Sequence, residues 1–72
     1  MTKRRDIIRR IVEAAKKRGM SFALTHEGGR HSIYKLDGLT IPIPRHREIG
    51  EGVTEAIYKQ CEPKLGKGWW RK

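Results

Sequence analysis

An Asp-Gly pair divides two short alternating runs in the middle of the chain, and this pattern constrains the fold most. Asp37-Gly38 is typical of the tight turn of a β-hairpin. Leu39, Ile41 and Ile43 follow the pair at alternate positions and share one face of a strand. The sequence therefore predicts that this strand pairs with a strand over residues 30–35. The prolines in the later strand indicate an edge position or an early end.

The register of this hairpin has two alternatives. A two-residue turn pairs Tyr34 with Ile41 and places Ile33 on the face opposite the other branched residues. A three-residue turn pairs Ile33 with Ile41 instead, and it places His31 opposite Ile43. We favour the second register because it collects all the branched residues on one buried face.

Helical and strand patterns lie on both sides of the hairpin. Residues 3–18 place apolar side chains at helical spacing, with Thr2 as the expected N-cap and Gly19 as the expected stop. Residues 21–26 alternate and predict a half-buried strand. Residues 51–62 predict the last helix. The sequence therefore predicts an α+β fold of order α-β-β-β-α, with a three-stranded antiparallel sheet and both helices on one face.

The last helix and the tail after it carry separate expectations. The apolar stripe of the helix consists of Val53, Ala56, Ile57 and Cys61, and Pro63 is expected to end the helix. The tail contains Trp69-Trp70 among lysines and arginines. Its tryptophans either stack on bases or dock a partner, or they fold back and cap the core. We expect one domain over residues 1–72, with a core of about 3–62 and a basic tail over 63–72.

The charge of the chain indicates a polyanionic partner. Lysine and arginine number 17 and aspartate and glutamate 8, which gives a net charge of +9 in 72 residues. Nucleic acid, or an acidic protein that mimics it, is the partner that fits. Lys3, Arg4 and Arg5 lie at the positive end of the first helix, where cations are unfavourable. Solvated cations are the commoner explanation of such a cluster, and a phosphate contact is the alternative.

Other features exclude whole classes of protein. The single cysteine, Cys61, excludes an internal disulfide and a four-cysteine zinc site, and its helical position predicts a small buried residue. No apolar run approaches the ~20 residues of a membrane span. No secretory apolar segment follows the N-terminal cations. We therefore expect a cytoplasmic protein that does not contact membranes.

His31 is the candidate catalytic residue. It follows a glycine pair and opens a strand, and histidine exchanges protons near neutral pH. RNA cleavage without a metal needs a base for the 2′-hydroxyl proton, cations for the charge on phosphorus, and an acid for the leaving oxygen. His31 could serve as the base or the acid, although a lone histidine at a strand start is more often structural. The candidates for RNA binding are Arg30, Lys35, Arg45 and Arg47, followed by Tyr34 and His46.

Metal chemistry has little support in the residues. The carboxylates are dispersed along the chain and form no compact cluster in sequence. His26 and His31 facing each other across the first hairpin would not by themselves specify a metal. Ser32 is no evidence for a nucleophile, because neighbours on a strand point to opposite faces. We expect neither a metal nor another cofactor.

A set of short motifs resembles a known family. Its members are the tripeptide Gly29-Arg30-His31 with Ile33-Tyr34, the segment Ile43-Pro44-Arg45-His46-Arg47-Glu48-Ile49, and Gly52, Ile57 and Lys59-Gln60 in the last helix. In this order and spacing, over about residues 5–62, the set resembles the HicA family of toxin ribonucleases from bacterial type II toxin–antitoxin modules.

The resemblance implies a fold, an activity and a partner. The fold is of the double-stranded RNA-binding-domain type, and His31 carries over as the catalytic residue. The activity is metal-independent cleavage of mRNA that halts growth. The partner is a HicB-type antitoxin, which covers His31 and represses the operon.

The chain departs from the family pattern at three positions. Arg30 stands where a small hydroxyl residue is common, and Ser32 stands where a second histidine is frequent. Glu55 replaces a common basic residue, which would weaken an RNA contact on the last helix.

Two rival functions remain open from the residues. A non-catalytic RNA-binding module of the same fold predicts binding with a steep salt dependence and intact RNA. A protein that only meets an acidic partner predicts complex formation without affinity for RNA.

Overall fold

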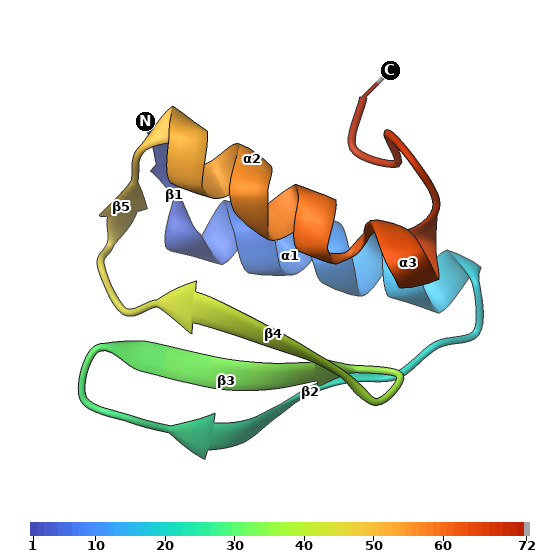
Figure 1. Ribbon diagram of the computed structural model, residues 1–72, viewed down its shortest axis with the longest axis horizontal. Helices are drawn as coiled ribbons and strands as arrows, with labels where there is room; N and C mark the ends of the chain where they lie inside the picture. Colours follow the sequence, from blue (N-terminus) through green and yellow to red (C-terminus); the bar gives the residue numbers. More distant parts are fainter. Residues whose placement is uncertain (72) are drawn as a thin grey trace.

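The computed structural model describes residues 1–71 and contains a three-stranded sheet with two helices on one side (Figure 1). The sheet has the antiparallel order β2-β3-β4, as predicted. A small sheet that the sequence did not predict joins β1 to β5. The elements are β1 (Thr2–Lys3), α1 (Arg4–Lys17), β2 (Phe22–Glu27), β3 (His31–Leu36), β4 (Leu39–Pro44), β5 (Glu48–Ile49), α2 (Glu51–Gln60) and α3 (Glu62–Leu65).

The first helix forms where its apolar stripe predicted it. Its buried positions recur every four residues, and Gly19 follows its end in the left-handed region with φ +67°. The predicted N-cap is wrong. Thr2 is paired with Ile49 in the small sheet, so Lys3 is the N-cap instead, and its side chain makes no capping bond because an ammonium group cannot accept one.

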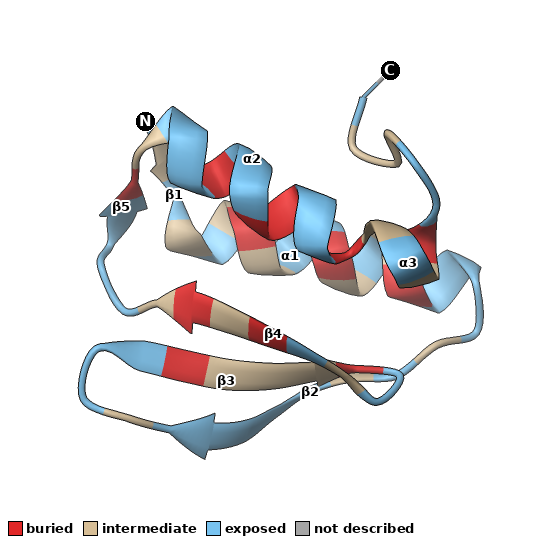
Figure 2. Ribbon diagram, viewed as in Figure 1, coloured by how far each residue is buried: buried red, intermediate tan, exposed pale blue. Residues whose placement is uncertain are grey.

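The core lies between the helices and the inner face of β3 and β4, where the buried residues of Figure 2 concentrate. The prediction of a half-buried β2 is wrong beyond Phe22, because β2 is an edge strand and the buried core lies over β3 and β4. Leu24 is 46% exposed, and a bulge interrupts the pairing between Leu24 and His26. The core residues are Ile7, Ile11, Ala15, Leu36, Ile41, Ile43, Ile49, Ile57, Tyr58, Cys61 and Leu65.

The hairpin takes the register that the sequence analysis rejected. Asp37 and Gly38 both have positive φ, at 50° and 91°, and they form a two-residue turn that pairs Leu36 with Leu39. Such a turn matches the natural twist of the two strands. Tyr34 is paired with Ile41, and its ring faces the core, where it stacks on Phe22 with 4.8 Å between centroids. The favoured register was wrong because it gave the inward position to Ile33 rather than to this tyrosine.

The other edge strand, β4, confirms the reading of its prolines. Among residues 1–71 it pairs with β3 alone, and it contains Pro42 and Pro44. Proline lacks an N–H group and is therefore tolerated at an edge.

The last helix confirms only part of its predicted apolar stripe, because Ile57 and Cys61 are buried but Ala56 is exposed. Val53 is 49% exposed, and Thr54 is buried in its place, with its hydroxyl donating to the Gly50 carbonyl at 2.9 Å. Pro63 does not end the helical segment, because it lies in the first turn of the short helix α3.

The described part of the tail folds back onto the helices. Trp69 Nε1 donates a hydrogen bond of 2.8 Å to the Tyr58 carbonyl, and both Trp69 and Trp70 pack their rings near that of Tyr58. The Arg71 guanidinium lies over the Trp70 ring at 5.2 Å. The tail therefore caps the core. Lys72, the last residue of the predicted basic tail, lies outside the described residues.

We expect Trp69→Ala to lower the free energy of unfolding by about 2 kcal/mol, because it removes a large half-buried ring and a hydrogen bond. The matched control is Lys67→Ala, which changes an exposed side chain of the same tail. Urea denaturation followed by far-UV circular dichroism gives both values. Equal midpoints for the two variants would mean that the tail contributes nothing to stability.

Burial raises the pKa of the Cys61 thiol from 9.0 to about 12. Above pH 9.0 the unfolded chain therefore loses a proton that the native protein keeps, so stability falls with rising pH between these two values. We expect the free energy of unfolding to decrease by up to about 1.4 kcal/mol per pH unit from this group. Urea titrations at several pH values should show a steeper decline than in Cys61→Ala. Parallel declines would contradict the shift.

Candidate functional site

His31 is exposed at the first position of β3, on the face of the sheet away from the helices. The next residue, Ser32, is fully buried on the helix side, and neighbours on a strand point to opposite faces. The Cα partner of His31 on β4 is Pro44, so the predicted partner Ile43 is wrong by one position. The expected closeness of His31 to the segment after β4 is confirmed, since Arg45 N donates to the Arg30 carbonyl at 3.1 Å.

The turn before His31 depends on a glycine for a close approach. Gly28 N donates to the His31 carbonyl at 2.9 Å, which continues the β2–β3 pairing by one more bond. A Cβ on Gly28 would lie 3.2 Å from the same carbonyl oxygen, whereas a Cβ on Gly29 would meet nothing within 4 Å. The steric requirement therefore falls on Gly28, one position before the tripeptide that the sequence emphasised.

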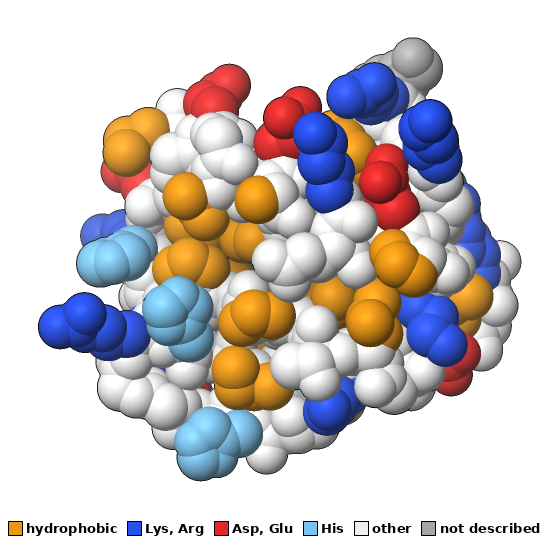
Figure 3. All heavy atoms as spheres, viewed as in Figure 1, with side chains coloured by type: hydrophobic (Ala, Val, Ile, Leu, Met, Phe, Trp, Pro, Cys, Tyr) orange, Lys and Arg blue, Asp and Glu red, His pale blue; other side chains and the backbone are white. Residues whose placement is uncertain are grey.

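The other two histidines lie at the same end of the sheet, where Figure 3 shows histidine side chains close to a basic one. His26 is paired with Ile33, which places it on the face of His31 but not directly opposite it. His46 is exposed in the loop after β4. It lines a hollow of about 390 Å³ together with Gly29, Arg30 and Arg45.

A hydrogen-bond network lies behind His31, on the inner side of the sheet. Arg4 Nη2 donates to Ser32 Oγ at 2.8 Å, and Ser32 Oγ donates to Glu27 Oε1 at 3.0 Å. Arg4 Nε also donates to the Pro44 carbonyl at 2.9 Å. Arg45 continues the network, with Nε 3.7 Å from Glu27 Oε1 and Nη1 donating to the Gly28 carbonyl at 2.9 Å. This network fixes both sides of the strand end that carries His31.

Sequence reasoning missed Arg4 and Glu27 as members of this site. The favoured hairpin register gave no signal of them, because it placed Ser32 on the outward face, where a serine needs no buried hydrogen-bond partner. The identity of the partner was hidden as well, since Arg4 is 28 residues away from Ser32.

A basic cleft opens beside the network, between the start of α1 and the loop after β4. Its volume is about 650 Å³, and its lining residues are Lys3, Arg4, Arg5, Arg45, Arg47 and Glu48. All six are charged, and five of them are cations.

The structure brings some predicted site residues together and separates others. Arg30, Arg45 and His46 share one hollow near His31, and Arg47 lines the basic cleft. Lys35 lies four positions along β3 from His31, roughly 13 Å away at the usual strand rise, and its Nζ hydrogen-bonds Thr40 Oγ1. The Tyr34 ring points to the core side.

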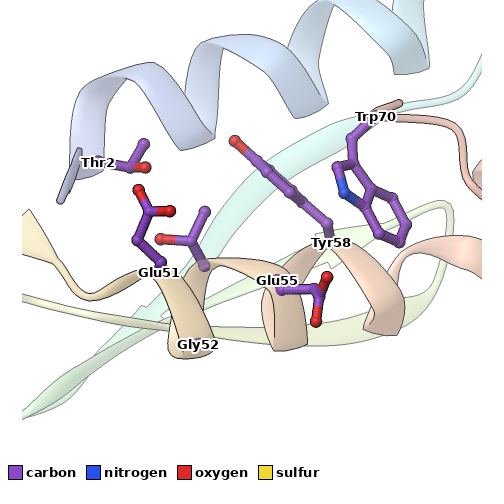
Figure 4. A pocket seen from close by; sticks show the side chains of 7 residues that line it. Thr2, Glu51, Gly52, Glu55, Tyr58 and Trp70 are labelled. Atoms are coloured by element: carbon purple, nitrogen blue, oxygen red, sulfur yellow. The ribbon is translucent and has the colours of Figure 1, made fainter. Parts of the chain in front are cut away.

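A separate cavity of about 390 Å³ lies against α2 and contains none of the predicted site residues (Figure 4). Glu55, one of the departures from the family pattern, lies at this cavity and forms ion pairs with Lys59 and Arg71 at 3.7 and 3.9 Å. The other lining residues are Thr2, Glu51, Gly52, Thr54, Tyr58 and Trp70.

The described residues contain neither a metal-binding cluster nor a membrane-spanning helix. Residues 1–71 include no group of three or more histidine, cysteine, aspartate or glutamate side chains placed to hold a metal ion. Within the same range, no helix has the length and apolar character that crossing a membrane requires.

Comparison with known proteins identifies the family. Curated proteins and solved structures gave no significant match. The family described as "HicA toxin of bacterial toxin-antitoxin" matches residues 8–62, which is most of the chain and includes His31 and the histidine of the hollow. A toxin of this class has an antitoxin partner. The motifs and the α-β-β-β-α fold agree with this match, and the chain belongs to the HicA family of toxins from bacterial toxin–antitoxin systems.

Proposed function

We propose that this toxin is a metal-independent endoribonuclease of the cytoplasm that cleaves mRNA, with His31 as its catalytic residue. The observation that carries the proposal is the placement of His31. Its side chain is exposed to solvent, while hydrogen bonds on both sides of its strand fix its backbone. A reacting group must be both accessible and held in position to act.

The reaction is a transfer at phosphorus within the RNA chain. The 2′-oxygen gives up its proton to a base and bonds to the adjacent phosphorus, and the 5′-oxygen of the next nucleotide leaves with a proton from an acid. His31 performs one of these proton transfers. His46, on the loop that follows the strand opposite His31, is the candidate for the other.

Cations around His31 support binding of the scissile phosphate. Arg30 precedes His31, and Arg45 shares a hollow with Arg30 and His46. A guanidinium group can donate two parallel hydrogen bonds to the oxygens of one phosphate, and it stabilises the negative charge that develops on those oxygens. We also propose that a HicB-type antitoxin neutralises the toxin by covering His31, because a partner on this exposed face would exclude RNA.

The fold also supports a non-catalytic alternative. Domains of order α-β-β-β-α that bind double-stranded RNA recognise shape and phosphates without cutting. The basic cleft fits such a role. The two functions differ in whether RNA is cut and in whether the loss of His31 matters.

We expect His31→Ala to remove growth arrest and to lower RNA cleavage by at least about 10²-fold, because one proton transfer loses its catalyst. The matched control is His26→Ala, another exposed histidine on the same face, which should remain toxic. Growth after tightly controlled induction and digestion of purified RNA in a metal chelator are the measurements. A folded, fully toxic His31→Ala variant would refute the assignment. RNA that binds tightly to the original protein and stays intact would favour the non-catalytic module.

We expect Ser32→Ala to lower the free energy of unfolding by about 1–3 kcal/mol, because Arg4 and Glu27 lose their shared buried partner. The kcat for RNA cleavage should fall by about tenfold with KM unchanged, since Ser32 positions His31 and touches no RNA. Thr25→Ala is the matched control, because that hydroxyl is exposed and donates to the Ile33 carbonyl at 3.1 Å. It should change stability by less than about 0.5 kcal/mol. A kcat equal to that of the control would leave Ser32 with a structural role only.

A further inference from the structure

The basic cleft is assembled from two segments that lie far apart in the sequence. Pairing of β1 with β5 places Lys3 opposite Glu48, and Arg4 N donates to the Arg47 carbonyl at 2.9 Å. The N-terminal cations therefore line the same cleft as Arg45 and Arg47. Cations at the start of a helix are unfavourable when the helix is considered alone. Their shared position in the cleft gives a reason for their presence there.

The positive charge of the cleft is only partly compensated within the described residues. Between residues 1 and 71, neither Lys3 nor Arg47 has a carboxylate within 4.0 Å, although Glu48 lines the same cleft. Arg5 has one contact at that limit, with Asp6. Cations gathered around a hollow repel one another, and an anion in the hollow relieves that repulsion.

The cleft adjoins the candidate catalytic site but opens on the other side of the sheet. Arg4 donates to the carbonyl of Pro44, which is the cross-strand partner of His31. Arg45 lines both the cleft and the hollow of Arg30 and His46. Since β4 is an edge strand, a chain can pass its end from the face of His31 to the cleft.

From these contacts we infer that the basic cleft binds the phosphate backbone of the RNA substrate, at nucleotides beyond the scissile bond. The inference rests on the proposed function and extends it to a second contact region. The chemistry of the lining favours RNA over an acidic protein. All six lining residues are charged, and a protein interface needs apolar anchors, whereas phosphates need only cations and hydrogen-bond donors.

A contact remote from the reacting bond has a kinetic signature. It strengthens the binding of RNA that is long enough to reach the cleft. It does not change the binding of a dinucleoside monophosphate, which has only the scissile phosphate. Loss of cleft cations should therefore raise KM for a longer RNA and leave cleavage of the dinucleotide unchanged.

The test compares two variants with the same loss of charge on the same helix. The double variant Lys3→Gln/Arg5→Gln removes two cleft cations, and Lys16→Gln/Lys17→Gln removes two exposed cations from the other end of α1. Binding is measured by fluorescence anisotropy in the His31→Ala background, with a single-stranded RNA of about twelve nucleotides. The cleft variant should bind about tenfold more weakly, and its slope of log affinity against log salt should decrease by about 1.4. The control variant should change little.

Several results would overturn the inference. One is an equal loss of affinity in both variants, which would mean that net charge matters and location does not. Another is an equal loss of cleavage on the dinucleotide and on the longer RNA. A third is competition by polyglutamate as effective as competition by RNA of the same charge, which would point to an acidic protein in the cleft.

The same experiment separates this inference from the proposed function. If the original protein cuts RNA and the cleft variant binds and cuts like the control, the cleft inference fails and the nuclease stands. If the original protein cuts no RNA but the cleft variant alone loses affinity, the nuclease proposal fails and the cleft stands.

Discussion

One arginine joins the three parts of the chain on which the site depends. The Arg4 side chain donates to Ser32 on β3 and to the Pro44 carbonyl at the end of β4, while its backbone N–H donates to the Arg47 carbonyl. A guanidinium group suits this task because its donors point in several fixed directions in one plane. The first turn of α1 is thereby attached to the strand that carries His31 and to the neighbouring strand β4. Burial of the Ser32 hydroxyl leaves no unpaired polar group, because Arg4 donates a hydrogen bond to it and Glu27 accepts one from it.

Local patterns predicted the order of elements well, because each pattern reports on a few consecutive residues. The apolar stripe of α1, the turn at Asp37-Gly38 and the edge position of β4 are all confirmed. The hairpin register was wrong because isoleucine and tyrosine are both apolar enough to face a core. The two-residue turn at Asp37-Gly38 and the stacking of Tyr34 on Phe22 of β2 decide between them. The exposure of Leu24 was equally hidden from the sequence, since it depends on the core lying over β3 and β4 rather than over β2.

In the candidate site, too, local features were predicted and features of the assembled fold were not. The closeness of His31 to the segment after β4 followed from the hairpin. Its exposure did not, because the favoured register placed His31 on the same buried face as Ile43, whereas the structure places it on the opposite face. Arg4 and Glu27 could not be found, because the pairing of a buried hydroxyl with distant charged groups is a property of the assembled fold. The N-terminal cations were recognised only as a local conflict. Their position beside Arg45 and Arg47 depends on the pairing of β1 with β5, and no pattern in the sequence predicted that pairing.

That pairing also sets an order of assembly. The two hairpins of the main sheet join neighbouring segments, whereas Thr2 must find Ile49 across most of the chain. The entropy of closing a loop grows with its length, so the hairpins can form while the chain is still being synthesised and the small sheet closes afterwards. A ribosome that has not yet released the segment around Ile49 therefore carries a toxin without its cleft. The cleft, which no pairing of neighbouring segments can build, is therefore among the last surfaces of the molecule to form.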